Sequence, residues 1–400
     1  MTSTHTLVRP TGAAPAAARV FLRLLGRLRH GHLRLIAPDG SRLLFGDLHH
    51  PVRAELQLYD WRACTAILRG GDIGFAEAWR DGWLDTPDLV ALLSLVLQNE
   101  AAMGRALHGG VLAGVWYWLR HWLRTNSRAG SRRNIHAHYD LGNDFYRLWL
   151  DESWSYSCAW FGGDFGQSLT VAQRSKNQRI IEVLGLQPGM RVLEIGCGWG
   201  GFAEQACRQG IAVHGVTLSP SQMAFASRRL AGQSLATLTL CDYRDLHGEY
   251  DAIVSVEMFE AVGERYWPGY FKTLRRCLRP GGQALVQSIT IDEVLFEHYR
   301  RGSDFIQQFI FPGGMLPSRE RFQSAAARQG LVLSDRADFG ADYAETLRRW
   351  RAAFEAQREA VRALGFDEAF IRTWLLYLCY CEVGFDAGRT GVSQFLLRKE

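Results

Sequence analysis

Paired cysteines are absent from this 400-residue sequence. Its eight cysteines include no CxxC pair, and the closest two, Cys379 and Cys381, are separated by one residue. Such scatter argues against a disulfide framework or a zinc site and favours a reducing cytoplasm. His136 and His138 have the spacing of two metal ligands on one strand, but no third ligand accompanies them, so no metal site is predicted.

Long apolar runs are also missing. The longest, "LVALLSLVL" (89–97) and "VLAGVWYWL" (111–119), fall well short of the ~20 residues that a membrane span requires. Arg23 and Arg27 interrupt the apolar stretch near the N-terminus, which argues against a signal peptide. With 47% hydrophobic residues, the sequence predicts a globular protein of one large or two smaller domains.

Acidic residues are scarce in the N-terminal third. Residues 1–135 hold 17 arginines and 10 acidic residues, whereas the remainder of the chain is slightly negative. On a helix, Arg19, Arg23 and Arg27 would form one stripe beside apolar residues, and 115–133 interleaves arginine with tryptophan and leucine. Such faces suit an anionic membrane surface; the alternatives are nucleic acid and a solvated helix edge. Because no nucleic-acid motif accompanies the patch, we expect peripheral association with a phospholipid membrane and no nucleic-acid partner.

The pattern of the chain changes near residue 130. Within residues 1–130, apolar and polar residues alternate over 31–60 as in β-strands, and helical patterns follow. This stretch therefore predicts a small α+β accessory domain. The expected helices are 61–69, 74–83 and 88–103. The polar stretch "TNSRAGSRRN" (125–134) has the composition of a linker.

Residues 131–400 predict an α/β domain with a Rossmann-like, doubly wound sheet. Short apolar strands alternate here with amphipathic helices, as in mostly parallel sheets that are covered on both faces. The expected strands are 190–196, 211–218, 236–242, 250–257 and 282–291. Helical additions at 340–364 and 367–385 and a last strand-like piece, "GVSQFLLRK", complete the domain.

A glycine turn points to a nucleotide-like cofactor. "VLEIGCGWGGF" (192–202) reads as strand, turn and helix, and Gly196, Gly198 and Gly200 would let the backbone approach a ligand. A dinucleotide fold needs an acid about 20 residues later, but the second strand ends in "HGVTLSPSQ". The acid is Glu194, inside the first strand, a placement typical of S-adenosylmethionine methyltransferases and not of NAD enzymes.

Two carboxylates stand where the strand at 250–257 should end. Glu257 and Glu260 belong to "SVEMFEAVGERYW", in which Glu260 lies between a phenylalanine and an alanine. Helix capping is one explanation, because acids favour a helix N-terminus. The other is an active-site carboxylate.

Several motifs resemble the cyclopropane-fatty-acyl-phospholipid synthase family of methyltransferases, which includes the mycolic acid cyclopropane synthases. They run in the family's order from about residue 133 to the end, and the N-terminal third resembles the extra domain of longer members only weakly. The motifs are "HYDLGNDFYRLWLDES" (138–153), "YSCAWF" (156–161), "VLEIGCGWGG", "GVTLSPSQ", "DYRDL" (242–246), "IVSVEMFEAVGERYW", "FIFPGGMLPS" (309–318) and "DFGADYAETLRRW" (338–350).

The resemblance implies a site for S-adenosylmethionine. Hydroxyl and amide groups would replace the usual ribose-binding acid, and an acid and a tyrosine would flank adenine. The implied residues are Tyr156 and Ser157 for the methionine part, Glu194, Gly196 and Gly198 for the amino acid and ribose, Thr217 and Gln222 for the ribose, and Asp242 and Tyr243, with Arg244, for adenine.

The resemblance also implies transfer of a methyl-derived carbon to the cis double bond of a phospholipid acyl chain, with a cyclopropane as the product. The resulting cation needs a dry pocket lined with aromatic faces. Trp160, Phe161, Phe259, Phe305, Phe309 and Phe311 are candidates for that lining. A bound bicarbonate would act as the base, held at the positions of Cys158, Glu260, Gln287, Ile289 and Tyr343.

This chain departs from the family at two histidines. Ala261 and Gln287 stand at those positions, and glutamine cannot carry a proton. Methylation without ring closure, giving a methyl- or methylene-branched chain, is therefore an alternative. A small-molecule methyltransferase is disfavoured by the apolar stretch at 291–316. The competing class is a non-catalytic or nucleic-acid-binding module that retains a methyltransferase fold. A homodimer is compatible with a long-form member.

Overall fold

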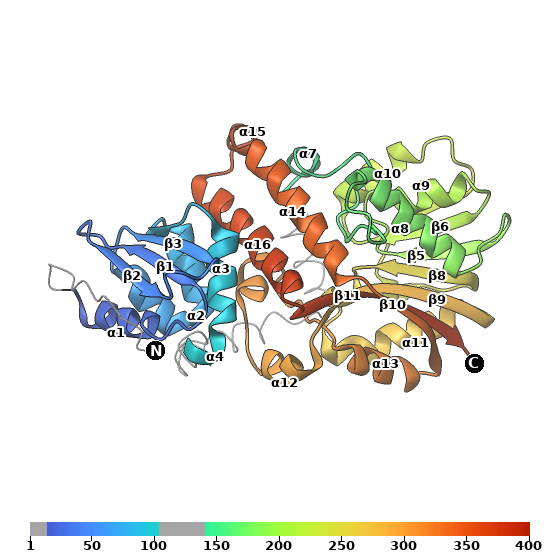
Figure 1. The fold of residues 1–400 in the computed structure, drawn as a ribbon. Coiled ribbons are helices and arrows are strands. Elements are labelled where there is room, and N and C mark those ends of the chain that lie inside the picture. Colours follow the sequence, from blue (N-terminus) through green and yellow to red (C-terminus); the bar gives the residue numbers. More distant parts are fainter. Residues whose placement is uncertain (1–13, 104–140) are drawn as a thin grey trace. The chain divides into compact units, whose positions relative to one another are not determined.

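The computed structural model describes residues 14–103 and 141–400, and the chain divides into two compact units (Figure 1). The first unit contains the described residues up to 103, 301–310 and 358–383. The second contains 141–300, 311–357 and 384–400. The predicted boundary near residue 130, the linker at 125–134, the basic stretch at 115–133 and the pair His136 and His138 lie outside the described residues.

A four-stranded sheet forms the centre of the first unit, in the order β2-β1-β3-β4. β1 (His32–Ile36) pairs antiparallel with β2 (Arg42–Gly46) and parallel with β3 (Arg53–Leu58), while β4 (Leu84–Asp85) extends the edge. The helices of this unit are α1 (Ala16–Leu25), α2 (Arg62–Arg80), α3 (Leu89–Gln98), α4 (Glu100–Met103), η5 (Ile306–Ile310), α15 (Arg358–Ala363) and most of α16 (Glu368–Asp386).

Two helices of this unit, α1 and α2, can be compared with their sequence predictions. Arg19 and Arg23 are exposed on α1, while Phe21 and Leu25 are buried, so the helix has a basic and an apolar face. The predicted stripe is shorter than expected, because α1 ends at Leu25 and Arg27 lies beyond its C-cap, Gly26. The helices expected at 61–69 and 74–83 form the single element α2, which is interrupted at Gly71 by a positive φ of 58°. No helix among the described residues is long and apolar enough to cross a membrane.

The second unit is built on a seven-stranded sheet, in the order β10-β11-β9-β8-β5-β6-β7. The strands are β5 (Arg191–Ile195), β6 (Ala212–Thr217), β7 (Ala236–Leu240), β8 (Tyr250–Val256), β9 (Leu278–Ile291), β10 (Leu331–Asp338) and β11 (Thr390–Lys399). Strands β5 to β9 are parallel to one another, and β11 runs antiparallel between β9 and β10. The predicted α/β class and doubly wound sheet are confirmed.

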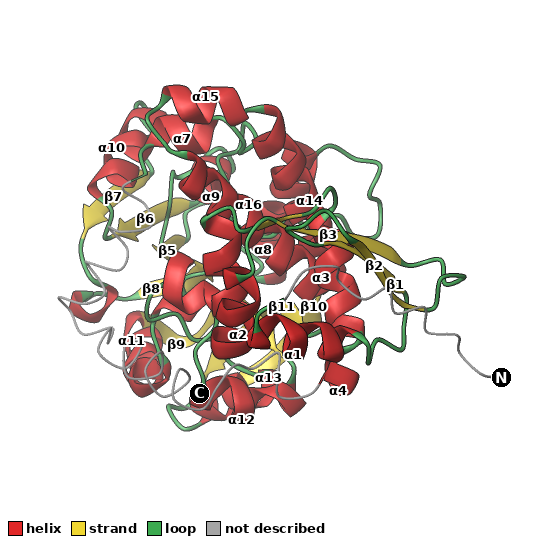
Figure 2. Cartoon of the chain, turned by 90° about the vertical axis from the view of Figure 1, so that its left-hand side faces the viewer, coloured by secondary structure: helices red, strands yellow, loops and turns green. Residues whose placement is uncertain are grey.

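Helices cover both faces of this sheet. α8 (Leu169–Val183), α9 (Gly201–Cys207) and α10 (Pro220–Arg229) lie on one side, and α11 (Trp267–Cys277) and α13 (Arg319–Ala327) on the other (Figures 1 and 2). Shorter elements complete the unit: α7 (Asn143–Arg147), η2 (Tyr243–Asp245), η3 (Phe259–Ala261), η4 (Glu264–Tyr266), α12 (Glu293–Arg301) and α14 (Gly340–Ala356). The helix expected at 340–364 ends at Ala356, and α15 follows it after Gln357.

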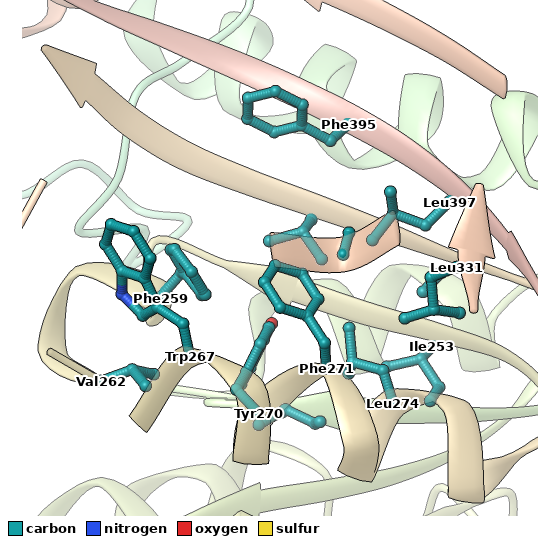
Figure 3. Packing of buried hydrophobic residues seen from close by; sticks show 14 of the residues in the cluster. Ile253, Phe259, Val262, Trp267, Tyr270, Phe271, Leu274, Leu331, Phe395 and Leu397 are labelled. Carbon is teal, nitrogen blue, oxygen red and sulfur yellow. The ribbon is translucent and has the colours of Figure 1, made fainter. Parts of the chain in front are cut away.

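An aromatic cluster beneath the sheet anchors the turn that follows β8. The ring of Phe259 is fully buried and lies beside that of Trp267, with 5.3 Å between the ring centroids (Figure 3). The ring centroid of Phe322 lies 4.9 Å from that of Phe259. Phe259 was expected to line an acyl pocket, but it belongs to this core. Its burial fixes the segment that carries Glu257 and Glu260, because a fully buried aromatic ring has a large free-energy preference for its packed position.

Candidate active site

The glycine turn after β5 lines a cavity, and we call this part of the lining, with Glu194, the cofactor end. Gly196, Gly198 and Gly200 all have positive φ, at 85°, 51° and 82°, which glycine adopts without strain. A Cβ at Gly196 would meet Met258 at 3.2 Å, whereas one at Gly198 would meet nothing within 4 Å. The turn therefore leaves room for a ligand beside its backbone.

Most of the residues predicted to bind the cofactor line this cavity. They are Tyr156, Ser157, Glu194, Gly196, Gly198, Thr217, Gln222 and Tyr243. Two predicted residues are not part of the lining. Gly200 is the N-cap of α9, and Asp242 is buried in an ion pair with Arg244, with 2.6 Å between Oδ2 and Nη2. Arg244 itself lines the cavity.

Glu194 fits a cationic or hydroxyl-bearing ligand. Its side chain is buried, and its Oε2 atom has no hydrogen-bond partner. Burial raises the pKa of Glu194 to about 8, although the charges of Lys176 and Arg229 act in the opposite direction. A buried acceptor without a partner is costly, so a bound ammonium or hydroxyl group would satisfy it. The residues at this end therefore suit the amino-acid and ribose parts of S-adenosylmethionine.

Lys176 on α8 is a cavity residue that sequence reasoning missed. Its Nζ atom donates to Ser157 Oγ at 2.6 Å and to Gln173 Oε1 at 2.7 Å. Burial lowers the pKa of Lys176, and the neighbouring carboxylates, Glu257 first among them, oppose that shift. Buried lysines are rare unless they are paired. Lys176 would place positive charge beside a ligand carboxylate.

Three of the residues predicted to hold the base converge on Glu257. The backbone N–H of Cys158 and the side-chain amide of Gln287 each donate to Glu257 Oε1 at 2.8 Å. The hydroxyl of Tyr343 donates to Glu257 Oε2 at 2.6 Å. Glu257 lines the same cavity as the glycine turn, so one cavity contains both the predicted cofactor site and this carboxylate.

Separate parts of the chain fix these donors. Gln394 on β11 donates to Gln287 Oε1 at 3.0 Å, which turns the NH₂ of Gln287 toward Glu257. The loop of Cys158 is bound to α14, which also carries Tyr343, because Thr346 accepts from the N–H of Ala159 at 3.2 Å. The donors are therefore preorganised around the carboxylate.

Burial and hydrogen bonding act in opposite directions on this group. Burial raises the pKa of Glu257 above its ordinary value, and the donors from Tyr343, Gln287 and Cys158 oppose that rise. The thiol of Cys158 is fully buried, and burial raises its pKa, so it is a poor nucleophile. Cys158 contributes through its backbone N–H.

Glu260 and Ile289, the other two predicted residues, form a second group. The N–H of Ile289 donates to Glu260 Oε1, and the hydroxyl of Ser288 donates to the same atom at 3.0 Å. Burial raises the pKa of Glu260 to about 8, and the nearby charge of Glu257 adds to the shift. The predicted set of five thus divides between two carboxylates, and the role assigned to Glu260 stays a prediction.

Bicarbonate does not fit the residues present. The three donors that would hold its oxygens already donate to Glu257. A second anion at this point would also lie against a carboxylate, and like charges at short range disfavour ionisation of both.

Comparisons with known proteins identify relatives that are methyltransferases or cyclopropane synthases. A family model described as mycolic acid cyclopropane synthetase matches residues 126–395. A tuberculostearic acid methyltransferase of Mycobacterium tuberculosis is 39% identical over 97% of this chain and 92% of its own length. A cyclopropane-fatty-acyl-phospholipid synthase of Escherichia coli is 37% identical over 80% of this chain and 81% of its own length.

A solved structure extends the similarity to three dimensions. A mycolic acid cyclopropane synthase complexed with SAH and CTAB superimposes with a TM-score of 0.63 and 32% identity. The match covers 67% of this chain and 98% of that one.

Proposed function

Because the chain belongs to the mycolic acid cyclopropane synthetase family of S-adenosylmethionine-dependent methyltransferases, we propose that it methylates the cis double bond of an unsaturated acyl chain in a phospholipid. Its cofactor is S-adenosylmethionine, and the homologues support methyl transfer to lipid. The phospholipid form of the substrate and the product belong to the proposal.

The observation that carries the proposal is a single cavity that is lined by Glu194 and the glycine turn and also by Glu257. S-adenosylmethionine supplies an electrophilic methyl group, which leaves a cation on the chain once it has added to an alkene. The chain must then lose a proton, and a preorganised carboxylate in a site shielded from water serves that need. Aromatic residues near the cavity, such as Trp154 and Tyr156, would stabilise positive charge.

Two products are compatible with this chemistry. We place the methyl- or methylene-branched chain first, because the relative that matches 97% of this chain is named a tuberculostearic acid methyltransferase and not a cyclopropane synthase. The cyclopropane is the second candidate, because the relative that matches 80% of the chain is named as a ring-forming synthase. Ring closure requires that the lost proton come from the new methyl group.

The product is read directly by mass spectrometry. Vesicles of cis-monounsaturated phospholipid are incubated with the enzyme and labelled cofactor, and the fatty acids are analysed before and after hydrogenation. We expect one added carbon and a double bond that hydrogenation removes. An added carbon with no reducible double bond would instead establish the ring. Label on a small soluble product and none on the acyl chain would contradict the proposal.

We also propose that the protein binds membranes through its first unit. Arg19 and Arg23 project from α1, and Val20, which lies between them in the sequence, is 46% exposed. An exposed helix face that combines arginine with apolar residues suits an anionic lipid surface. Flotation with anionic vesicles should carry the protein upward at low salt and release it at high salt. Equal recovery with neutral vesicles, or preferential binding to RNA or DNA, would contradict this.

A further inference from the structure

The hydrogen bonds around Glu257 form a complete anion-binding arrangement. Its two carboxylate oxygens accept from an N–H of the backbone, an amide and a phenol, at 2.6–2.8 Å. Charge-assisted hydrogen bonds of this length are strong. Three donors from different parts of the chain would hold any small oxyanion that reached this point, and here they hold a side chain of the protein itself.

The backbone at Glu257 is an independent sign that the carboxylate has a function. Of the described residues, Trp154 and Glu257 are the two non-glycine residues with positive φ, at 56° and 48°, and both line the cavity. This left-handed conformation is strained for a residue with a Cβ and favours glycine. A glycine would satisfy the backbone at 257, so the glutamate is kept there at a cost in stability.

A purely structural role explains these features poorly. A buried acid whose only role was structural would lie in the core, whereas Glu257 is partly exposed to the cavity that also contains the predicted cofactor site. Helix capping does not apply, because the next element is the single turn η3, whose N-cap residue is Met258.

We propose that Glu257 is the resident general base of this enzyme and that it takes the place of a bound bicarbonate. The inference rests on the proposed function. In the step it performs, a C–H bond of the cationic acyl chain breaks and its electron pair forms the new C–C or C=C bond. The proton passes to a carboxylate oxygen of Glu257, which becomes a neutral acid and later releases the proton to water. No further reactant is needed.

The test uses bicarbonate binding, which needs no lipid. ¹³C-labelled bicarbonate is titrated into the full-length protein with bound S-adenosylhomocysteine and followed by NMR line broadening. We expect no binding by the wild type and none by Glu257→Gln, in which the amide still fills the site. Glu257→Gly should bind, because it frees the three donors and suits the backbone. Binding by the wild type, or none by Glu257→Gly, would overturn the inference.

Turnover provides the second readout. In buffer stripped of carbon dioxide, the wild type should keep its full rate, while Glu257→Gly should be slower by about 10²-fold or more, as for loss of a general base. Added bicarbonate or formate should restore part of the rate of Glu257→Gly and none of that of Glu257→Gln. A wild-type rate that falls when carbonate is removed would contradict the inference.

The two readouts separate the inference from the function on which it rests. If the wild type methylates no lipid, the proposed function fails, whereas the bicarbonate titration still decides whether Glu257 occupies the anion site. Calorimetry with S-adenosylhomocysteine verifies that each variant is folded and retains the cofactor end of the cavity.

Discussion

The cofactor end and the turn that carries Glu257, which we call the base end, use unusual backbone conformations in opposite ways. At the cofactor end, positive φ falls on glycines such as Gly196 and Gly198, which adopt it freely and let the backbone approach a ligand. In the turn that carries Glu257 it falls on a residue with a Cβ, for which it is strained. The cofactor end therefore gains space from missing side chains, and the base end retains a side chain despite strain.

Glu257→Gln should produce the largest effect of the four variants, on turnover and not on cofactor affinity. The amide keeps the shape but cannot take the proton, so we expect turnover to fall by about 10²-fold or more. Affinity for S-adenosylhomocysteine should change little. Glu264→Gln is the matched control, since Glu264 pairs with Arg300 at 2.7 Å and is not part of the cavity lining. Equal turnover in the two variants would remove Glu257 from the mechanism.

Glu194→Gln should weaken cofactor binding strongly and reduce turnover only slightly. Glutamine cannot offer the second acceptor oxygen that a bound ammonium or hydroxyl group would satisfy, and such a loss costs roughly 1–3 kcal/mol, so we expect the Kd for S-adenosylhomocysteine to rise by about 10- to 100-fold. Turnover at saturating cofactor should fall much less than in Glu257→Gln. Calorimetry measures the first quantity and a radiolabel assay the second. An unchanged Kd would show that Glu194 does not contact the cofactor.

Tyr343→Phe should have a smaller effect, with a signature in the pH profile. Its hydroxyl lowers the pKa of Glu257, so its removal lets burial raise that pKa further. Since the base must be ionised, activity rises with pH through this pKa, and the variant's profile should shift to higher pH. We expect roughly a tenfold loss near neutral pH and partial recovery in alkali.

A control for this variant is Tyr59→Phe, because Tyr59 is 54% exposed. It should leave both the rate and the profile unchanged. A lower rate for Tyr343→Phe with the same fractional loss at every pH would mean that the hydroxyl does not act through the ionisation of Glu257.

Glu260→Gln should have the smallest effect, on stability. The folded-state pKa of about 8 lies above the ordinary 4.5, so the folded protein holds a proton that the unfolded chain releases. The stability due to this group is full below about pH 4.5 and is lost as pH rises to 8. The variant should therefore show a flatter decline of Tm between pH 5 and 9, by about 2–4 °C. An identical decline would mean that Glu260 is ionised in the folded state.

Local motifs made the cofactor end predictable. The strand β5, its glycine turn and the segment 217–222 are each continuous in sequence, so their local motifs were sufficient to predict that they line the cavity. Asp242 lies outside the cavity lining and pairs with Arg244, two residues later, at 2.6 Å, so its contact with adenine stays a prediction. Lys176 left no signal, since a buried lysine on a helix has the same local pattern as a solvated one.

The base end depends on features that spacing does not encode. Cys158, Gln287 and Tyr343 come together as the resemblance implied, but on Glu257. Two acids three residues apart offered two candidates, and the choice depends on the backbone of the turn, where φ of Glu257 is 48°. The strain and the convergence of donors from distant segments are visible only in three dimensions.

A single-turnover experiment tests the central claim most directly. Enzyme preloaded with cofactor that carries a deuterated methyl group is mixed with cis-monounsaturated phospholipid vesicles in solution stripped of carbon dioxide, and the fatty acids are examined by mass spectrometry. We predict deuterium in the acyl chain, in an amount that approaches the amount of enzyme, without added carbonate. Deuterium that stays in the cofactor until bicarbonate is supplied, or that enters a molecule other than the acyl chain, would contradict the account.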